Sequence, residues 1–233
     1  MADGVQSVDE DFTVMFKWSM DIMFSNSKVW LYPVAVSFID GLLSAGVSWY
    51  MFSMGFPGLF LMPLLGMFQI LINIALLIII FFLTLISVKM FVQVYEGGRV
   101  DFDSAKDEIL SSAGSYLVIG ILAAILSIFI ITIPLALLFI VVSVIVGAGD
   151  IGKDFSLSID ILSKNLVPVI LLSIISIILS LIVSALSSSP LFLGVVIFSP
   201  LSTFVDILIL GAFTYLSLKA LGFGVSEESG DLE

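Results

Sequence analysis

Residues 109–149 read ILSSAGSYLVIGILAAILSIFIITIPLALLFIVVSVIVGAG and contain no charged side chain. One membrane-spanning helix needs about 20 apolar residues, so this stretch is long enough for two spans and a tight turn. We predict the turn at Thr132-Ile133-Pro134, because proline is favoured in the first turn of a new helix. Residues 109–149 therefore predict a transmembrane hairpin.

Two other regions repeat this design. Residues 165–205 are also uncharged and carry Ser187-Ser188-Ser189-Pro190 near their middle. Residues 29–88 carry one charge, Asp40, and are interrupted at Gly55-Phe56-Pro57-Gly58. We predict an all-α integral membrane protein with six transmembrane helices arranged as three hairpins. The predicted spans cover residues 29–52, 60–90, 114–131, 134–149, 166–186 and 191–220, each bounded to within a few residues.

The composition agrees with this class and excludes several functions. Hydrophobic residues make up 60% of the 233 residues and charged residues 12%, against about 45–50% and 25% in soluble domains. The chain contains no Cys and no His, which removes thiol nucleophiles, thiolate metal sites and the commonest general base. With 19 acidic and 8 basic residues it lacks the basic surface that nucleic-acid binding requires. We expect no enzyme activity, no cofactor, no metal and no nucleic-acid partner.

The basic residues predict the orientation. All eight flank the same ends of the predicted spans, and the three opposite turns carry no charge. Basic residues collect on the cytoplasmic side of membrane proteins, so we expect a multi-pass protein of the cell membrane with both termini in the cytoplasm. The eight are Lys17, Lys28, Lys89, Arg99, Lys106, Lys153, Lys164 and Lys219.

Each predicted hairpin follows a segment with helical periodicity, and the three segments begin alike, at Asp11-Phe12, Asp101-Phe102 and Asp154-Phe155. We predict a cytoplasmic amphipathic helix before each hairpin, with Asp11, Asp101 and Asp154 as the helix N-caps. The pattern predicts a threefold internal repeat with units of about 10–90, 100–149 and 153–221. These units form one predicted membrane domain, 10–221, between an acidic tail at 1–9 and a disordered acidic tail at 222–233.

The same segments carry a resemblance to a known group of proteins. Asp101-Phe102 through Ala105, and Asp154-Phe155 through Ser158 and Asn165, each lead into an apolar hairpin. In this the chain resembles prokaryotic six-span membrane proteins akin to the membrane domain attached to some glycerophosphodiester phosphodiesterases. The resemblance implies a membrane fold and no hydrolase activity, because the soluble phosphodiesterase barrel is missing.

Asp40 and Asp206 are the ionisable residues that lie well inside predicted spans. Counted from the cytoplasmic ends, both are expected about 18–21 Å deep at 1.5 Å per residue. If the first and sixth spans are neighbours, the two carboxylates meet and form a proton or cation site, because two bare charges there are costly. Alternatively, each Asp is protonated and hydrogen-bonded between helices, or lies in a water-filled crevice without transport. The neutral ligands predicted for such a site are Gln69 and Asn73, with the hydroxyls of Ser37, Ser44, Ser202 and Thr203.

The sequence leaves three functions open. The leading one is a non-catalytic protein that organises or accompanies a partner, either another membrane protein or a second copy. The second is a small secondary transporter or channel that uses Asp40 and Asp206, and the third is a lipid-modifying enzyme. The net charge of -11 has two explanations, adaptation to a high-salt cytoplasm, as in halophilic archaea, or an acidic docking surface.

Overall fold

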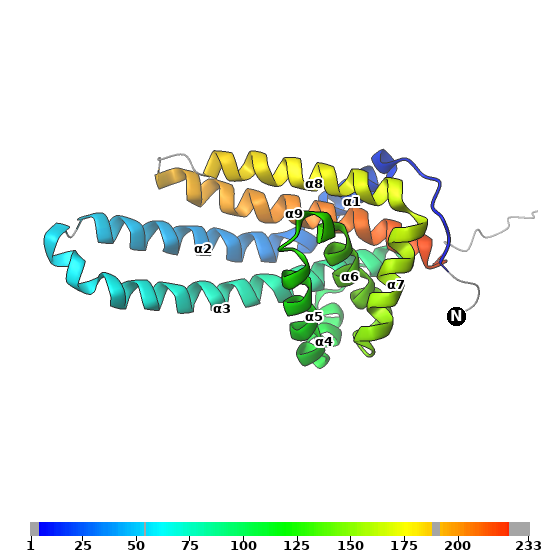
Figure 1. Ribbon diagram of the computed structural model, residues 1–233, viewed down its shortest axis with the longest axis horizontal. Helices are drawn as coiled ribbons and strands as arrows, with labels where there is room; N and C mark the ends of the chain where they lie inside the picture. The colour runs from blue at the N-terminus through cyan, green and yellow to red at the C-terminus, as the bar shows by residue number, and fades with distance from the viewer. Residues whose placement is uncertain (1–4, 54, 188–191, 224–233) are drawn as a thin grey trace, which may run out of the picture. The chain divides into compact units, whose positions relative to one another are not determined.

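The computed structural model describes residues 5–53, 55–187 and 192–223, and the regular structure in these ranges is helical (Figure 1). The long helices are α2 (Lys28–Ser53), α3 (Gly55–Tyr95), α8 (Leu166–Ser187) and α9 (Phe192–Ala220). The short helices are α1 (Phe12–Ser25), α4 (Phe102–Ser111), α5 (Ala113–Leu126), α6 (Ile133–Val146) and α7 (Ile151–Lys164), with a 3₁₀ turn, η1, at Ile130–Thr132. Within these ranges, each of the short helices α1, α4 and α7 is followed by two further helices.

Four helical segments are long and apolar enough to cross a membrane. They are Lys28–Tyr50, Gly66–Tyr95, Leu166–Leu186 and Val196–Ala220, and a fifth is added only if α4 and α5, which are bent by 80°, count as one span. Their outer side chains fit a lipid environment, since Trp49, Leu77 and Leu181 are all more than 60% exposed. The prediction of an all-α protein with several transmembrane helices is confirmed, but six spans are not shown.

The predicted and observed numbers of spans differ because of the middle pair of helices, α5 and α6. Helices α5 and α6 have 14 residues each and are about 21 Å long, whereas the hydrocarbon layer is about 30 Å thick. Helix α5 ends at Leu126, where the Ser127 hydroxyl donates to the Ala123 carbonyl, and α6 ends at Gly147, whose φ of 78° favours glycine. Hydropathy alone does not detect these endings, so the predicted spans 114–131 and 134–149 exceed the observed helices.

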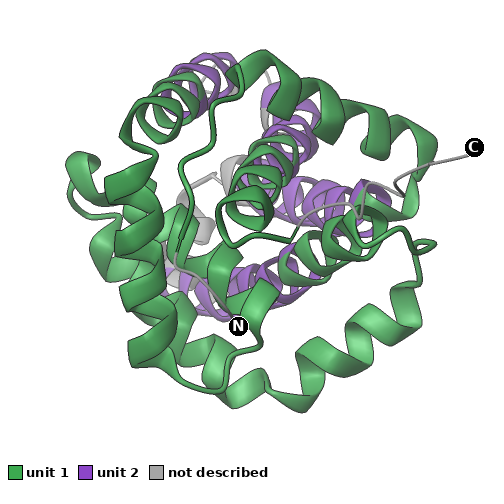
Figure 2. Cartoon of the chain, turned by 90° about the vertical axis from the view of Figure 1, so that its right-hand side faces the viewer, with its two compact units in different colours: residues 1–29, 85–175, 208–233 green, residues 30–84, 176–207 purple. Residues whose placement is uncertain are grey.

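The described chain divides into two compact units (Figure 2). The first unit contains residues 1–29, 85–175 and 208–233, which include α1, α4, α5, α6 and α7. The second contains residues 30–84 and 176–207. The long helices α2, α3, α8 and α9 contribute residues to both units.

In the first unit, α1 packs closely against α9 and α3. The Ser19 hydroxyl donates to the Leu208 carbonyl at 2.8 Å, and Met15 and Met23 on the same face are fully buried. Gly211 permits this approach, because a Cβ atom there would overlap Ser19 Oγ and lie 2.6 Å from Cζ of Phe91. Met15 and Met23 therefore belong to a packed core, whereas Met20 of the same helix is 42% exposed.

Candidate functional site

The second unit contains Asp40, on α2, and Asp206, on α9. Asp40 is half-buried, and its Oδ1 atom is buried without a hydrogen-bond partner among the described residues. Asp206 is exposed. Whether these two carboxylates share a site depends on how α2 and α9 are aligned.

Two contacts within the second unit give this alignment. The Ser37 hydroxyl lies 2.9 Å from the Ser199 hydroxyl, and the Trp30 and Phe204 rings meet with their centroids 5.4 Å apart. The helices therefore run antiparallel, with Asp206 level with about residue 30 of α2. Asp40 lies about ten residues further along α2, which is about 15 Å at 1.5 Å per residue. The prediction that both carboxylates lie at one depth and form one site is wrong, because the antiparallel register separates them.

Within the described ranges, no hydrogen bond joins a predicted neutral ligand to Asp40 or Asp206. Asn73 is exposed on α3, while Gln69, Ser44 and Ser202 are half-buried. Thr203 is buried, and its hydroxyl donates to the Ser199 carbonyl of its own helix at 3.4 Å. The Ser37 hydroxyl forms a hydrogen bond to a neighbouring helix, at Ser199 of α9.

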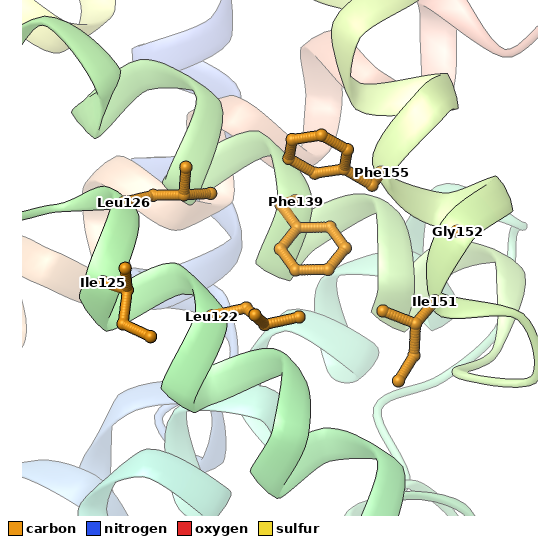
Figure 3. A pocket seen from close by; sticks show the side chains of 7 residues that line it. All are labelled: Leu122, Ile125, Leu126, Phe139, Ile151, Gly152 and Phe155. Carbon is orange, nitrogen blue, oxygen red and sulfur yellow. The ribbon is translucent and has the colours of Figure 1, made fainter.

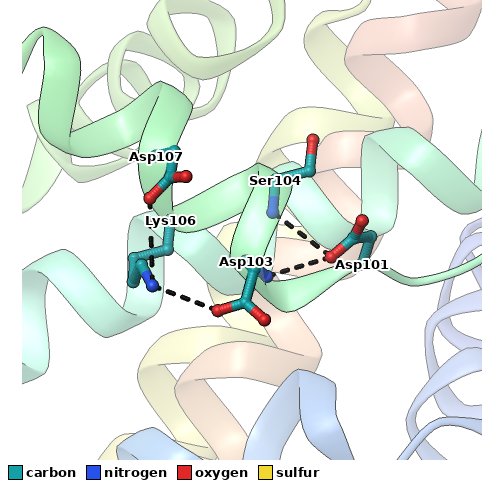
Figure 4. Close-up of polar contacts among 5 residues, drawn as sticks. All are labelled: Asp101, Asp103, Ser104, Lys106 and Asp107. Carbon is teal, nitrogen blue, oxygen red and sulfur yellow. Dashed lines mark hydrogen bonds and ion pairs between the residues drawn. The ribbon is translucent and has the colours of Figure 1, made fainter.

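The first unit contains the predicted helix caps. The Asp11 carboxylate accepts a hydrogen bond from the Thr13 amide, and that of Asp101 accepts from the amides of Asp103 and Ser104 (Figure 4). Each lies at the N-cap of its helix. Both carboxylates satisfy amide groups that the first turn of a helix leaves without partners.

The prediction for the third cap is wrong. The N-cap of α7 is Asp150, whose carboxylate accepts from the Lys153 amide at 3.1 Å. Gly147 ends α6, so the chain is free to begin a new helix at Asp150 rather than four residues later. Asp154 therefore lies inside α7.

Asp154 forms a buried polar site that the sequence did not indicate. It is 1% exposed, and its Oδ2 atom has no hydrogen-bond partner within the described ranges. Burial raises the pKa of this carboxyl, and Asp150 raises it further, while the nearby Ser143 hydroxyl and Lys153 partly offset the effect. Ser143, on α6, forms no hydrogen bond of normal geometry through its own hydroxyl, although its carbonyl accepts from the Tyr116 hydroxyl at 3.4 Å.

Helix α4 presents an acidic surface. Asp103 and Asp107 are well exposed, and both pair with Lys106, at 3.0 and 3.8 Å (Figure 4). The hydrogen bond with Asp103 is the main cause of a raised pKa at Lys106. Glu108 pairs with Lys89 of α3 at 2.6 Å. Together with Asp101 this short helix carries four exposed carboxylates, which we call the α4 acidic surface: Asp101, Asp103, Asp107 and Glu108.

The chain before α1 is packed rather than free where it is described. The side chain of Asn165 forms two hydrogen bonds with this segment. Its oxygen accepts from the Val8 amide at 2.6 Å, and its nitrogen donates to the Gln6 carbonyl at 3.1 Å. The Gln6 amide also donates to the Ala220 carbonyl at 2.7 Å. Residues 5–9, predicted to belong to an acidic tail, are thus held against the ends of α7 and α9. The predicted C-terminal tail falls almost entirely outside the described residues.

Glu10 also attaches the segment before α1 to helix α9. Its carboxylate accepts hydrogen bonds from the Tyr215 hydroxyl and from Lys219 Nζ, each at 2.7 Å. Burial raises the pKa of Glu10, but the hydrogen bonds from Lys219 and Tyr215 outweigh burial, and the net pKa is lowered. Tyr215 packs in turn against Trp18 and Tyr95, with ring centroids 5.1 and 5.9 Å away.

None of these groups forms a recognisable metal centre. The described part of the chain contains no cluster of three or more Asp, Glu, His or Cys side chains placed to hold a metal ion.

No protein-family model, curated protein or solved structure matches the chain. The resemblance to the membrane domain of glycerophosphodiester phosphodiesterases therefore stays a prediction. The class is defined by the fold itself, a polytopic helical membrane protein associated with the bilayer through its apolar helices.

Proposed function

We propose that this protein is a non-catalytic membrane protein whose inner face docks a partner that carries basic side chains. The observation that carries the proposal is the α4 acidic surface, where four exposed carboxylates are opposed by two lysines, Lys106 of the same helix and Lys89 of α3. Complementary charge at the edge of an interface accelerates association and selects the partner. A second copy of this chain is a poor occupant, because each copy carries a net charge of -11.

The proposal places α1, α4 and α7 at the cytoplasmic boundary, in the cell membrane, with both termini inside. The distribution of the eight basic residues supports this orientation. It assigns four crossing helices, and it makes α5 and α6 a short hairpin that enters the membrane and returns to the inner face. Such a hairpin leaves α4 and α7 on the same side, as a hairpin of two full spans would.

The threefold repeat is part of the proposal. Each unit consists of a short inner helix and a helical pair, and the order of the helices supports it. In the middle unit the helical pair, α5 and α6, is shorter than the pairs of the other two units. The short helix of this unit, α4, is also the most polar of α1, α4 and α7. In this proposal the three units share one arrangement of helices, and the middle unit carries the docking surface.

The absence of catalysis is also part of the proposal. The chain contains no His and no Cys. The acidic groups on the inner face cap helices and pair with lysines, as Asp101 and Asp103 do, rather than converging on one point. These features favour a binding role over general acid–base or nucleophilic chemistry.

A zero-length carbodiimide crosslinker, which joins carboxylates to lysines, tests the docking role in the native membrane. We expect Asp103 and Asp107 to crosslink to lysines of one defined partner. The yield should fall several-fold in the Asp103→Asn/Asp107→Asn variant and remain unchanged in Asp160→Asn, which removes an exposed carboxylate from α7. Crosslinks that form only within the chain, or that ignore the α4 substitutions, would overturn the docking role.

A salt titration separates docking from adaptation to a high-salt cytoplasm. Docking predicts that the crosslinks to the partner weaken in about 1 M KCl, where the Debye length is about 3 Å. Adaptation to salt predicts instead that the isolated protein unfolds at low salt and is stabilised steeply as KCl is added.

A further inference from the structure

An apolar pocket of about 350 Å³ lies among α5, α6 and α7 in the first unit (Figure 3). Helix α5 contributes Leu122, Ile125 and Leu126 to its wall, and α6 contributes Phe139. The volume falls within the range of about 300–1,000 Å³ that small-molecule pockets occupy. No charged side chain lines the pocket, so its chemistry suits a hydrocarbon.

The first turns of α7 form the remaining wall through Ile151, Gly152 and Phe155. The Phe155 ring meets Phe139 edge to face, with centroids 5.4 Å apart, which fixes one end of the pocket. At Gly152 the wall has no side chain, and an added Cβ would meet nothing closer than Asp150 Oδ1 at 3.5 Å. The pocket therefore exists because Gly152 has no side chain and lies beside the paired rings of Phe139 and Phe155.

The pocket is continuous with the surface that meets lipid. Leu122 and Ile125 are 38% and 53% exposed, so the α5 wall opens onto the outer face of the helix. The turn between α5 and α6 is the most exposed apolar segment described, with Ile128, Phe129, Ile130 and Ile131 between 65% and 89% exposed. An exposed apolar segment of this kind marks a surface that meets a membrane or another protein, and in a chain that associates with the bilayer we place it, and the pocket beside it, at the depth of lipid chains.

We propose that this pocket binds one acyl chain of a bilayer phospholipid. A hydrocarbon chain fills the apolar volume without burying a polar group, and it reaches the pocket along the exposed face of α5. Asp150, at the rim, favours an esterified chain over a free fatty acid. The carboxylate of a free acid lies at the end of the chain and would be repelled by Asp150, whereas a phospholipid has an uncharged ester carbonyl there and carries its phosphate farther away, beyond the glycerol.

The proposal is tested with a phospholipid that carries a photoreactive diazirine in one acyl chain. The protein is reconstituted into vesicles of phosphatidylethanolamine and phosphatidylglycerol that contain this probe, extracted into detergent, illuminated and digested for mass spectrometry. We expect labelling at Leu126 and Phe155 to survive extraction, because a chain in the pocket is retained. Labelling at Ile121, which is 62% exposed on the same helix and outside the pocket, should be lost.

Substitutions that fill the pocket provide the matched comparison. Leu126→Trp and Ile151→Trp each place a bulky ring in the pocket and should lower the retained label about tenfold, because a close-packed volume has no room for both groups. Ile121→Trp, the same enlargement on the outer face of α5, should leave it unchanged. The elution volume of each variant reports whether it has folded, and the wild-type labelling pattern tests the proposal independently of any variant.

Three results would overturn the proposal. Pocket label that is lost on extraction as readily as surface label would show that the chain is not bound. Equal label in wild type and in both folded pocket variants would place the lipid elsewhere. Labelling of the pocket by a diazirine palmitic acid as strong as that by the phospholipid would show that the site does not distinguish an ester from a free acid.

Discussion

The hydroxyl of Ser37 on α2 lies 2.9 Å from the hydroxyl of Ser199 on α9, and Ser199 also donates to the Ser37 carbonyl at 3.2 Å. This pair holds the two helices in an antiparallel register. It leaves Asp40 one turn beyond Ser37, and Asp206 about two turns along α9 in the opposite direction. The position of the hydroxyl pair therefore leaves the two carboxylates about 15 Å apart along the helix axes.

Because they are separate, Asp40 and Asp206 should not be energetically coupled. In a double-mutant cycle with Asp40→Asn and Asp206→Asn, the effects on the free energy of unfolding should add to within about 0.5 kcal/mol. Unfolding by SDS in mixed micelles measures this. A coupling above about 1 kcal/mol, or a cation flux in proteoliposomes that both substitutions abolish, would restore the shared ion site.

Gly211 should not tolerate a side chain. Gly211→Ala forces a methyl group into Ser19 and Phe91 and should destabilise the protein by about 1–3 kcal/mol, as overpacked cores do. Gly114→Ala is the matched control, because its Cβ would meet nothing within 4 Å. It should be neutral or stabilise α5 by up to about 1 kcal/mol. Equal effects of the two substitutions would contradict the close packing of α1 against α9.

The attachment of the N-terminal segment should weaken in acid. Hydrogen bonds from Lys219 and Tyr215 lower the pKa of Glu10, so its contribution is complete above its ordinary pKa of 4.5 and is lost as the pH falls below that value through the lowered pKa. Hydrogen exchange of the Gln6 and Val8 amides reports the attachment. Exchange should accelerate in acid after correction for the intrinsic pH dependence of the exchange chemistry.

The variant Glu10→Gln provides the control for this titration. It should show fast exchange at neutral pH, with a loss of stability of about 1 kcal/mol, and no further change in acid. Corrected exchange that does not vary with pH in wild type, or that still varies in Glu10→Gln, would exclude Glu10 as the group responsible.

Asp154 should produce the opposite pH dependence. Burial raises its pKa, so the folded state binds the proton more tightly than the unfolded state. Stability should be highest below the ordinary pKa of 3.8 and fall as the pH rises through the raised pKa. Asp154→Asn should remove this fall and leave the variant more stable than wild type at pH 7, by about 1–3 kcal/mol. A parallel pH dependence in both proteins would contradict an uncompensated buried carboxyl.

The sequence predicted what hydropathy and charge determine. Uncharged runs such as 165–205 correspond to helices long enough to cross the membrane. Asp11 and Asp101 stand before helices that begin at the next residue. These features are local, because helix capping and membrane insertion depend on the composition of one segment.

The sequence failed where tertiary contacts decide. In α7, spacings of three and four place Phe155, Ser158 and Ile159 on one helix face, but the buried residues are Asp154, Ser158 and Ile161, and Ile159 is exposed. The spacing of apolar residues does not predict a buried carboxylate. The predicted buried face of α7 is therefore rotated about the helix axis relative to the observed one. The position of Asp206 depends on the register of α2 against α9, and no single segment encodes that register.

The side of the membrane from which the α5–α6 turn can be reached distinguishes a short hairpin from two full spans. The chain contains no Cys, so a single cysteine placed in it is the only thiol in the protein. Labelling with a membrane-impermeant maleimide, applied to intact cells or to inverted vesicles, compares Ile130→Cys with Ser53→Cys and Ser163→Cys, all of which replace exposed side chains. We predict that Ser53→Cys reacts only from outside, Ser163→Cys only from inside, and Ile130→Cys from neither side. Reaction of Ile130→Cys from outside, equal to that of Ser53→Cys, would show that α5 and α6 cross the membrane and contradict the short hairpin.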